Sequence, residues 1–289
     1  MLDLTMGKSI TFNLVIPFGG NSDLLMQTVE SVLNQSYKDW SLLIINDGTD
    51  FDLHQILRSY TNKIEVLSLP EKIGIARIFD LAVEKLTGEI GMILGADDLL
   101  EENFLQGMSK AWNATPNVAL IHPRVLTIDE ESRIKVQFVD FFKRCIAPTN
   151  FKRVVHGRLL LYSLLNGNWM YFTSSTFNVS KLKAYKFNSG LKIAMDWELA
   201  LRMGLAGETF GYCKDATFFY RRHKNSLSMM KESSILRLQE EITVVRDFGK
   251  TCRKLRKFDL WIFSGLHFNS YLNFLLRKFS KSSLTCSRQ

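Results

Sequence analysis

The sequence has few of the features that stabilise small secreted domains or anchor a chain in a bilayer. Its four cysteines stand far apart in 289 residues, so they form neither a CxxC pair nor a dense disulfide framework. They are Cys145, Cys213, Cys252 and Cys286. No run of about 18 apolar residues occurs, and the opening residues lack the basic start and apolar stretch of a signal peptide. We therefore expect reduced thiols in a cytoplasmic chain that is neither secreted nor membrane-spanning.

The composition also excludes disorder, collagen and fibre, because 46% of the residues are hydrophobic and 23% are charged. The charge is unevenly distributed along the chain. Residues 231–289 hold 12 Lys and Arg against 5 Asp and Glu, so they carry seven of the eight net positive charges. A near-neutral body with a basic, aromatic-rich end indicates a catalytic domain with a docking element for an anionic surface.

Short apolar runs alternate with amphipathic stretches from residue 11 onward, which predicts helices between the strands of a largely parallel sheet. The expected strands are 12–16, 40–45, 64–69, 90–94 and 118–121. Helical spacing after a natural N-cap at Asn21 or Ser22, and again over residues 75–86, predicts the first helices. The fold class is therefore α/β.

The second half is less regular. We expect a strand over residues 169–179, a helix beginning near Met195 and a strand around 217–220, whereas residues 129–168 follow no clear period. The composition changes near residue 230. The predicted organisation has three parts: an N-terminal tail (1–9), a catalytic domain (10–230) and a basic helical extension (231–289).

Polar side chains follow the predicted strands where each strand ends. Asp47 follows the second strand, Asp97 and Asp98 follow the fourth, and the third leads into Arg77. Ligands of open parallel sheets bind beyond the carboxyl ends of the strands, so these groups converge on one rim if the second and fourth strands are near neighbours. Such a rim suits a divalent cation and a phosphate-bearing ligand, although Asp98 also suits an ordinary helix cap.

Read in order, five segments resemble the family 2 glycosyltransferases of the GT-A fold over about residues 10–230. The segments are NLVIPFGG, VESVLNQSYKDWSLLIINDGTD, EKIGIARIFDLAVEKLTGEIGMILGADD, AMDWELALR and YRRHKNSLS. The resemblance implies a single Rossmann-like GT-A catalytic domain with a mostly parallel sheet. It also implies inverting transfer of a sugar from a nucleotide-sugar donor, with Mn²⁺ or Mg²⁺ as cofactor.

The resemblance assigns residues to the nucleotide site. Asp47 corresponds to the acid that hydrogen-bonds the uracil ring, Arg77 to the basic residue near the nucleotide, and Asp97 to the ribose contact. Pro17 and Arg221 belong to the same site. A carboxylate accepts a hydrogen bond from N3–H of uracil or thymine but repels the acceptor edge of cytosine, so a UDP-sugar is the expected donor and dTDP stays open.

The resemblance also assigns the metal ligands and the catalytic base. Asp98 is expected to bind the metal, and His223 in the late loop is expected to join it, since neutral imidazole suits Mn²⁺. Asp196 corresponds to the base that removes a proton from the acceptor hydroxyl. An acidic residue in the first turn of a helix is also favoured by the helix dipole alone, and Glu198 is the alternative base.

Three residues depart from the family pattern. Asn46 stands where an Asp is usual, Ile78 follows Arg77 where an Asn is common, and Met195 replaces a Glu before Asp196. Asn46 retains hydrogen bonding without charge, and Met195 removes a negative neighbour of the base. We therefore expect base recognition and the pKa of Asp196 to differ from the family pattern.

Rival classes lack their own signatures. A dinucleotide-dependent oxidoreductase needs a GxGxxG turn after the first strand, where residues 17–21 read PFGGN, and a nucleotidylyltransferase needs a Gly-rich basic first loop. A scaffold or binding protein that docks through the basic tail on a membrane or on nucleic acid remains an alternative. Because RNP, zinc-finger and helix-turn-helix signatures are missing, we expect no nucleic-acid partner.

The tail predicts an amphipathic helix over about residues 258–281, with Ser264 on its polar side and Trp261 on its apolar side. Basic residues precede the helix and close it, so residues 253–281 are expected to contact the cytoplasmic face of a membrane. Packing on the body or on a second subunit is the alternative. Family and tail together favour surface-polysaccharide synthesis, such as O-antigen or capsule, on a glycan or lipid-linked saccharide acceptor.

Overall fold

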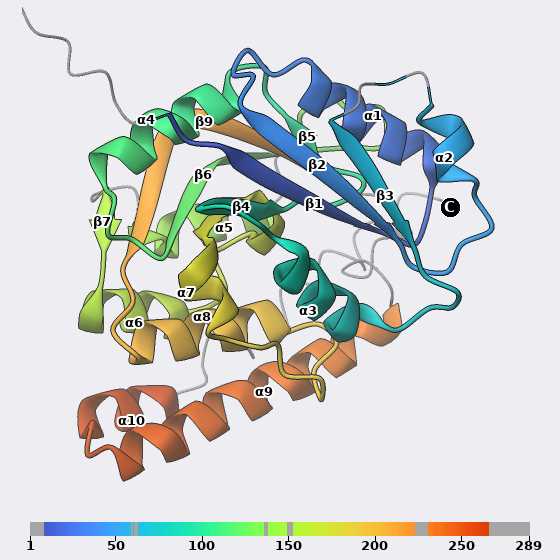
Figure 1. Ribbon diagram of the computed structural model, residues 1–289. Helices are drawn as coiled ribbons and strands as arrows, with labels where there is room; N and C mark the ends of the chain where they lie inside the picture. The colour runs from blue at the N-terminus through green and yellow to red at the C-terminus, as the bar shows by residue number, and fades with distance from the viewer. Residues whose placement is uncertain are drawn as a thin grey trace, which may run out of the picture.

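The computed structural model describes residues 9–58, 60, 63–135, 138–148, 153–222 and 231–265. These residues form a nine-stranded sheet flanked by helices (Figure 1). In the order of pairing, the strands are β3 (Ile64–Ser68), β2 (Trp40–Asn46), β1 (Phe12–Phe18), β4 (Ile90–Ile93), β8 (Thr176–Asn178), β6 (Leu120–Ile128), β9 (Phe210–Arg221) and β5 (Leu99–Leu100), with β7 (Val154–Val155) also paired to β9.

Most of the strands run in one direction. β1 is parallel to β2 and β4, β2 is parallel to β3, and β6 is parallel to β9. β8 is antiparallel to both β4 and β6, so the two reversals give β6 and β9 the direction of β1. β5 and β7 run against β9. The predicted α/β class with a mostly parallel sheet is confirmed.

Helices cover both faces of the sheet. They are α1 (Ser22–Leu33), α2 (Leu53–Ile56), α3 (Ile75–Lys85), α4 (Phe104–Ala114), α5 (Phe138–Ile146), α6 (Gly157–Leu165), α7 (Val179–Lys183), α8 (Met195–Leu205), α9 (Lys231–Lys254) and α10 (Phe258–Gly265). Along β1, Leu14 and Ile16 face the core formed with α1 and α4, whereas Val15 faces the core formed with α3, α6 and α8. This alternation follows from the two-residue period of a strand.

The predicted start of α1 is confirmed. Asn21 is the N-cap, and its Oδ1 accepts hydrogen bonds from the backbone N–H groups of Asp23 (2.8 Å) and Leu24 (3.2 Å). These bonds satisfy N–H groups that have no partner within the helix. α3 likewise begins at Ile75, as the spacing predicted.

The predicted strand over residues 169–179 is wrong over most of its length. A 3₁₀ turn (η2, Phe172–Ser174) precedes β8, which has three residues. Trp169 and Met170 are adjacent and both buried, so the segment lacks the alternation of a strand surface. The irregular stretch 129–168 contains α5, β7 and α6.

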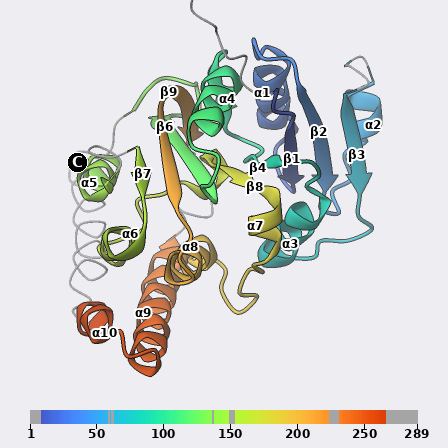
Figure 2. The same cartoon turned by 60° about the vertical axis from the view of Figure 1, so that its left-hand side comes forward.

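The C-terminal helices lie beside α6 and α8, away from α1 and α4 (Figure 1 and Figure 2). Ser264 of α10 is buried, contrary to its predicted place on the polar side, because Gly249 of α9 leaves room for it: a Cβ on Gly249 would lie 2.3 Å from the Ser264 Oγ. Residues 266–281 of the predicted helix lie outside the described residues. Within the described part, every helix is too short or too polar to cross a membrane.

Candidate functional site

The ends of the first, second and fourth strands meet at one edge of the sheet. β1 lies between β2 and β4, with Phe18 opposite Asn46 and Val15 opposite Ile93. The backbone N–H of Asp47 donates to the carbonyl of Phe18 (2.7 Å), which joins the two loops beyond these strands. The condition placed on the rim, that the second and fourth strands be near neighbours, is therefore met.

Asp47 is fixed by the segment that leads into α3. Its Oδ1 accepts a hydrogen bond from the backbone N–H of Ile73 (2.9 Å). Gly48 has a φ of +61°, and a Cβ there would lie 2.5 Å from the backbone of Glu71. Only glycine fits this close approach at a positive φ without strain. The two loops are thus packed together beneath the Asp47 carboxylate.

The hydrogen bonds of Asn46 account for an amide at this position, where the family usually has an Asp. Its side-chain N–H groups donate to the carbonyls of Thr49 (3.2 Å) and Phe51 (3.3 Å), and its Oδ1 accepts from the N–H (3.1 Å) and hydroxyl (2.7 Å) of Thr49. A carboxylate has no donor for the two carbonyls. The amide therefore closes the turn that carries Asp47.

Asp98 lies in the turn between β4 and β5 and is buried, with 2% of its surface exposed. Its Oδ1 accepts from the backbone N–H of Arg221 (2.9 Å), and its Oδ2 accepts from the Thr173 hydroxyl (3.1 Å). A Cβ at Gly95 would lie 2.4 Å from Oδ2, so this glycine makes room for the carboxylate. Burial, followed by repulsion from Asp97, raises the pKa of Asp98 well above its ordinary value.

Arg221 holds the aspartate pair in place from the end of β9. Its side chain is buried, with 1% of the residue exposed, and Nε donates to the carbonyl of Asp97 (2.7 Å). The terminal nitrogens donate to Gln27 Oε1 (2.9 Å) and to the carbonyl of Glu130 (3.0 Å). These contacts give Arg221 a structural role, while its assignment to the nucleotide site stays a prediction.

Asp196 lies in the first turn of α8, where its oxygens accept from Asn168 Nδ2 (3.1 Å) and from the backbone N–H of Trp197 (2.7 Å). Burial raises the pKa of Asp196, and the nearby charge of Lys143 opposes the shift. Glu198 instead forms an ion pair with Arg202 along the same helix (2.7 Å). Of the two acids predicted as base, Asp196 is therefore the better placed.

A cleft of about 410 Å³ brings the predicted groups of both halves together, since Pro17, Asp97, Asp98 and Asp196 all line it. Asp47 is not among the lining residues. The position of His223 lies outside the described residues.

Arg77 is exposed on the first turn of α3 and is also absent from the cleft lining. Its nucleotide contact, like the other residue roles drawn from the family, stays a prediction.

Four basic residues in the cleft were not predicted: Lys143 on α5, Lys192 before α8, Arg222 just after β9, and Arg237 on α9. Arg222 belongs to the late segment that resembles the family and forms an ion pair with Asp140. Burial, aided by the charge of Arg222, lowers the pKa of Lys143 to about 7. Lys143 and Arg237 carry no local sequence signal, because α5 and α9 reach the cleft only through the tertiary fold.

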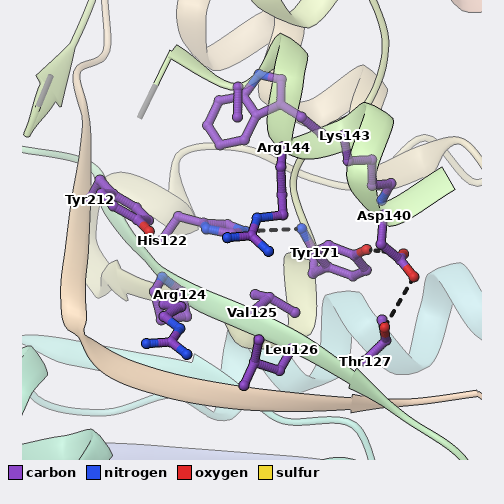
Figure 3. A pocket seen from close by; sticks show the side chains of 13 residues that line it. His122, Arg124, Val125, Leu126, Thr127, Asp140, Lys143, Arg144, Tyr171 and Tyr212 are labelled. Atoms are coloured by element: carbon purple, nitrogen blue, oxygen red, sulfur yellow. Dashed lines mark hydrogen bonds between the residues drawn. The ribbon is translucent and has the colours of Figure 1, made fainter. Parts of the chain in front are cut away.

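Tyr171 lines both the cleft and a second hollow of about 100 Å³, whose side chains are drawn in Figure 3. Its hydroxyl donates to Asp140 (2.6 Å), which also accepts from Thr127 (3.0 Å), and its backbone N–H donates to His122 Nε2 (3.2 Å). Burial lowers the pKa of His122 to about 3, so the ring is neutral and accepts this bond. Tyr171 is therefore held by hydrogen bonds at both its hydroxyl and its backbone N–H.

The fold, with an aspartate pair in the cleft at the edge of the sheet, is that of a GT-A glycosyltransferase. The chain matches the model of glycosyl transferase family 2 over residues 14–176 and belongs to this family. Glycosyltransferase GlyG of Streptococcus pneumoniae serotype 4 is 22% identical over 263 residues, which cover 84% of this chain and 78% of that protein. The teichoic acid poly(glycerol phosphate) polymerase of Staphylococcus epidermidis is 25% identical over 194 residues, 65% of this chain but 25% of that protein.

Solved structures share the fold. S. aureus TarS 1-349 in complex with UDP superposes with a TM-score of 0.58 at 14% identity, covering 83% of this chain and 70% of that one. GalNAc-T7 with UDP, GalNAc and Mn²⁺ gives a TM-score of 0.56 at 13% identity, covering 74% and 44% of the two chains.

Proposed function

We propose that this glycosyltransferase moves a sugar, with inversion, from a UDP-sugar to a saccharide acceptor. The main support is the cleft, whose lining includes both the aspartate pair of the first half and Asp196 of the second half. The presence of UDP in the solved structures of TarS and GalNAc-T7 supports the choice of nucleotide.

In this proposal, Asp47 binds the uracil ring and Asp97 the ribose, with Pro17 and Arg77 as further contacts. The Oδ1 of Asp47 accepts the hydrogen bond from Ile73. Gly19 lies beside the other oxygen, since a Cβ on Gly19 would lie 3.9 Å from Asp47 Oδ2. A residue without a side chain at this point leaves room for a base to approach the second oxygen.

The aspartate pair suits a hard divalent cation, Mn²⁺ or Mg²⁺. Each oxygen of Asp98 accepts one hydrogen bond, which leaves lone pairs for a cation, and Asp97 lies beside it on the cleft. Within the described residues, no group of three or more His, Cys, Asp or Glu side chains could hold an ion, so substrate phosphate and water would complete its ligands. When bound, the ion neutralises the charge that grows on the departing diphosphate.

Asp196 acts as the general base in this mechanism. It takes the proton of the acceptor hydroxyl while the hydroxyl oxygen bonds to the anomeric carbon, opposite the breaking bond to the diphosphate. Burial raises the pKa of Asp196, which makes it a stronger base than an exposed carboxylate. Asn168 and the N–H of Trp197 orient its two oxygens.

The acceptor that we propose is a glycan or lipid-linked saccharide of surface-polysaccharide synthesis. The polymerase that the chain resembles acts in teichoic acid synthesis by name, which supports this setting. Trp261 and Ile262 on α10 are 39% and 62% exposed beside the basic run 253–257, which supports peripheral contact with an anionic membrane.

A screen of UDP-, dTDP- and GDP-sugars tests the donor. We expect UDP with Mn²⁺ to raise Tm and a UDP-sugar to be hydrolysed only when metal is present. Asp47→Asn keeps an acceptor for Ile73 but loses the charge, so it should weaken UDP binding whichever sugar is attached. A response to dTDP or GDP alone would refute the choice of UDP, and a protein that ignores every nucleotide and Mn²⁺ would refute the proposed enzyme in favour of a scaffold.

Vesicles containing anionic lipid test the membrane contact. Ile262→Ser should weaken binding at low salt, whereas Ile235→Ser, at an equally exposed site on α9, should not. Equal binding of both variants and the unmodified protein, or no binding by any of them, would refute the contact.

A further inference from the structure

α9 is hydrogen-bonded to the turn that leads into α8, the helix that carries Asp196. The carboxylate of Glu240, which is buried, accepts three backbone N–H groups: Oε1 from Lys192 (2.9 Å), and Oε2 from Ile193 (2.8 Å) and Ala194 (2.9 Å). Ala194 is the N-cap of α8, two residues before Asp196. The basic extension is thus joined directly to the segment that presents the base.

Arg237 lies one helical turn before Glu240, on the same side of α9, and reaches the cleft beside Asp196. Its Nε is buried and has no hydrogen-bond partner among the described residues. A buried N–H without an acceptor costs about 1–3 kcal/mol, so such a group is usually paired in the functional state. An oxygen-bearing ligand would provide the missing acceptor.

Lys143 presents a second basic group at the same place. Because burial lowers its pKa to about 7, it is partly charged at neutral pH, and a bound anion favours its charged form. Its ammonium donates to the carbonyl of Met170 (3.2 Å) and lies 3.9 Å from the centre of the Tyr171 ring. Lys143 and Arg237 line both the cleft and an adjoining hollow of about 60 Å³, whose wall also includes Glu241. Two cations facing one small hollow are suited to an oxyanion.

The location of the two cations separates them from the donor half of the cleft. The charged partner of Asp97 and Asp98 is Arg221, which is hydrogen-bonded to both residues. The charges of Lys143 and Arg237 act instead on Asp196, lowering the pKa that burial raises. Lys143 and Arg237 also line the hollow together with Asn168, which donates to Asp196, so they lie near the proposed base.

We propose that Lys143 and Arg237 form an anion subsite, which binds a phosphate or carboxylate group carried by the acceptor. The subsite implies that the acceptor is anionic. Because Arg237 lies on α9, the C-terminal extension then contributes to acceptor specificity. This inference rests on the proposed transfer reaction. It adds the chemical class of the acceptor and two residues that select it.

Isothermal titration of the full chain tests the subsite, with UDP and MnCl₂ present to occupy the donor side. The probes are glycerol 3-phosphate, glycerate and glycerol. We expect both anions to bind and glycerol not to bind. Arg237→Gln should weaken the anions about 10-fold or more, as the loss of a charged hydrogen bond does, without changing UDP affinity. Arg246→Gln is the matched control, since this α9 side chain is 58% exposed.

The outcomes that would overturn the inference are distinct from failure of the proposed function. Equal binding of glycerol and glycerol 3-phosphate eliminates the anion subsite. If Arg237→Gln weakens UDP binding and leaves anion binding unchanged, Arg237 contacts the donor and not the acceptor. Lys143→Gln repeats the test if Arg237→Gln does not fold. If the unmodified protein ignores UDP, the transfer reaction fails, and the same titrations without UDP decide whether the anion site exists.

Discussion

A carboxyl group that is buried beside a second carboxylate binds its proton more tightly in the folded chain than in the unfolded chain. Asp98 is in this position, and its pKa is raised by burial and by Asp97. Folding is therefore disfavoured as the pH rises above the ordinary pKa of an aspartate, because the unfolded chain then releases the proton more readily. The metal-free protein carries this cost at neutral pH.

Asp98→Asn should accordingly stabilise the metal-free protein while removing activity. We expect its Tm at pH 7 in EDTA to exceed that of the unmodified protein by on the order of 2 °C or more, with the gap closing toward pH 4. Differential scanning calorimetry across this pH range measures the effect. A gap that does not depend on pH, or full activity of the variant, contradicts the assignment.

Asp196→Asn should leave UDP affinity unchanged and lower sugar transfer by a factor on the order of 10² or more, as expected when a general base is neutralised. In the unmodified protein, transfer should decline as the pH falls through the raised pKa of Asp196, since protonation removes the base. Initial rates from pH 4 to 8 provide the check. If the variant loses UDP binding yet turns over bound donor, Asp196 is a binding residue.

At the scale of the element, Glu240 offers a test that separates positioning from binding. Glu240→Ala removes the acceptor of three N–H groups before α8, one of them on buried Ala194. We expect a loss of about 1–3 kcal/mol in unfolding free energy, a lower kcat and an unchanged KM for the donor. Gln239→Ala, on the exposed side of the same helix, is the control. Equal loss of kcat in both variants would exclude a positioning role.

The elements of the first half could be predicted because local signals agree there. Asn21 caps α1, buried positions recur at helical spacing, and the aspartates follow strand ends. The stretch 129–168 has no such agreement, since Phe141 of α5 and Leu159 of α6 are large apolar residues that remain exposed. Periodicity then does not identify the buried face of either helix.

The same limit applies to the site. Asp97, Asp98 and Asp196 lie on segments with family motifs, and the cleft brings them together. Lys143 and Arg237 reach that cleft through the packing of α5 and α9, which depends on contacts between residues far apart in the chain. Because a single sequence does not reveal these tertiary contacts, it gives no reason to select Lys143 and Arg237 as site residues.

At the scale of the whole molecule, a chain that ends at residue 230 tests whether the segments 10–230 and 231–289 fold separately. α9 contributes Val244, Val245 and Phe248 to the core shared with α8. Each is worth about 1.5–3 kcal/mol when buried, and the sum approaches the stability of a typical domain. We expect the chain ending at 230 to be insoluble or to melt far below one ending at 265. Equal Tm values for the two would show that the segments are independent.

The contacts that build the cleft also set when it is completed during synthesis. Arg221 joins Gln27, which is 194 residues earlier, and Asp98, which is 123 residues earlier. Glu240 then fixes the turn before α8, 46 residues back from its own position. A nascent chain that has left the ribosome only as far as β8 therefore has β1 to β4 but lacks the hydrogen bonds of both Arg221 and Glu240. We therefore expect the cleft to be completed late in translation, once α9 has been synthesised.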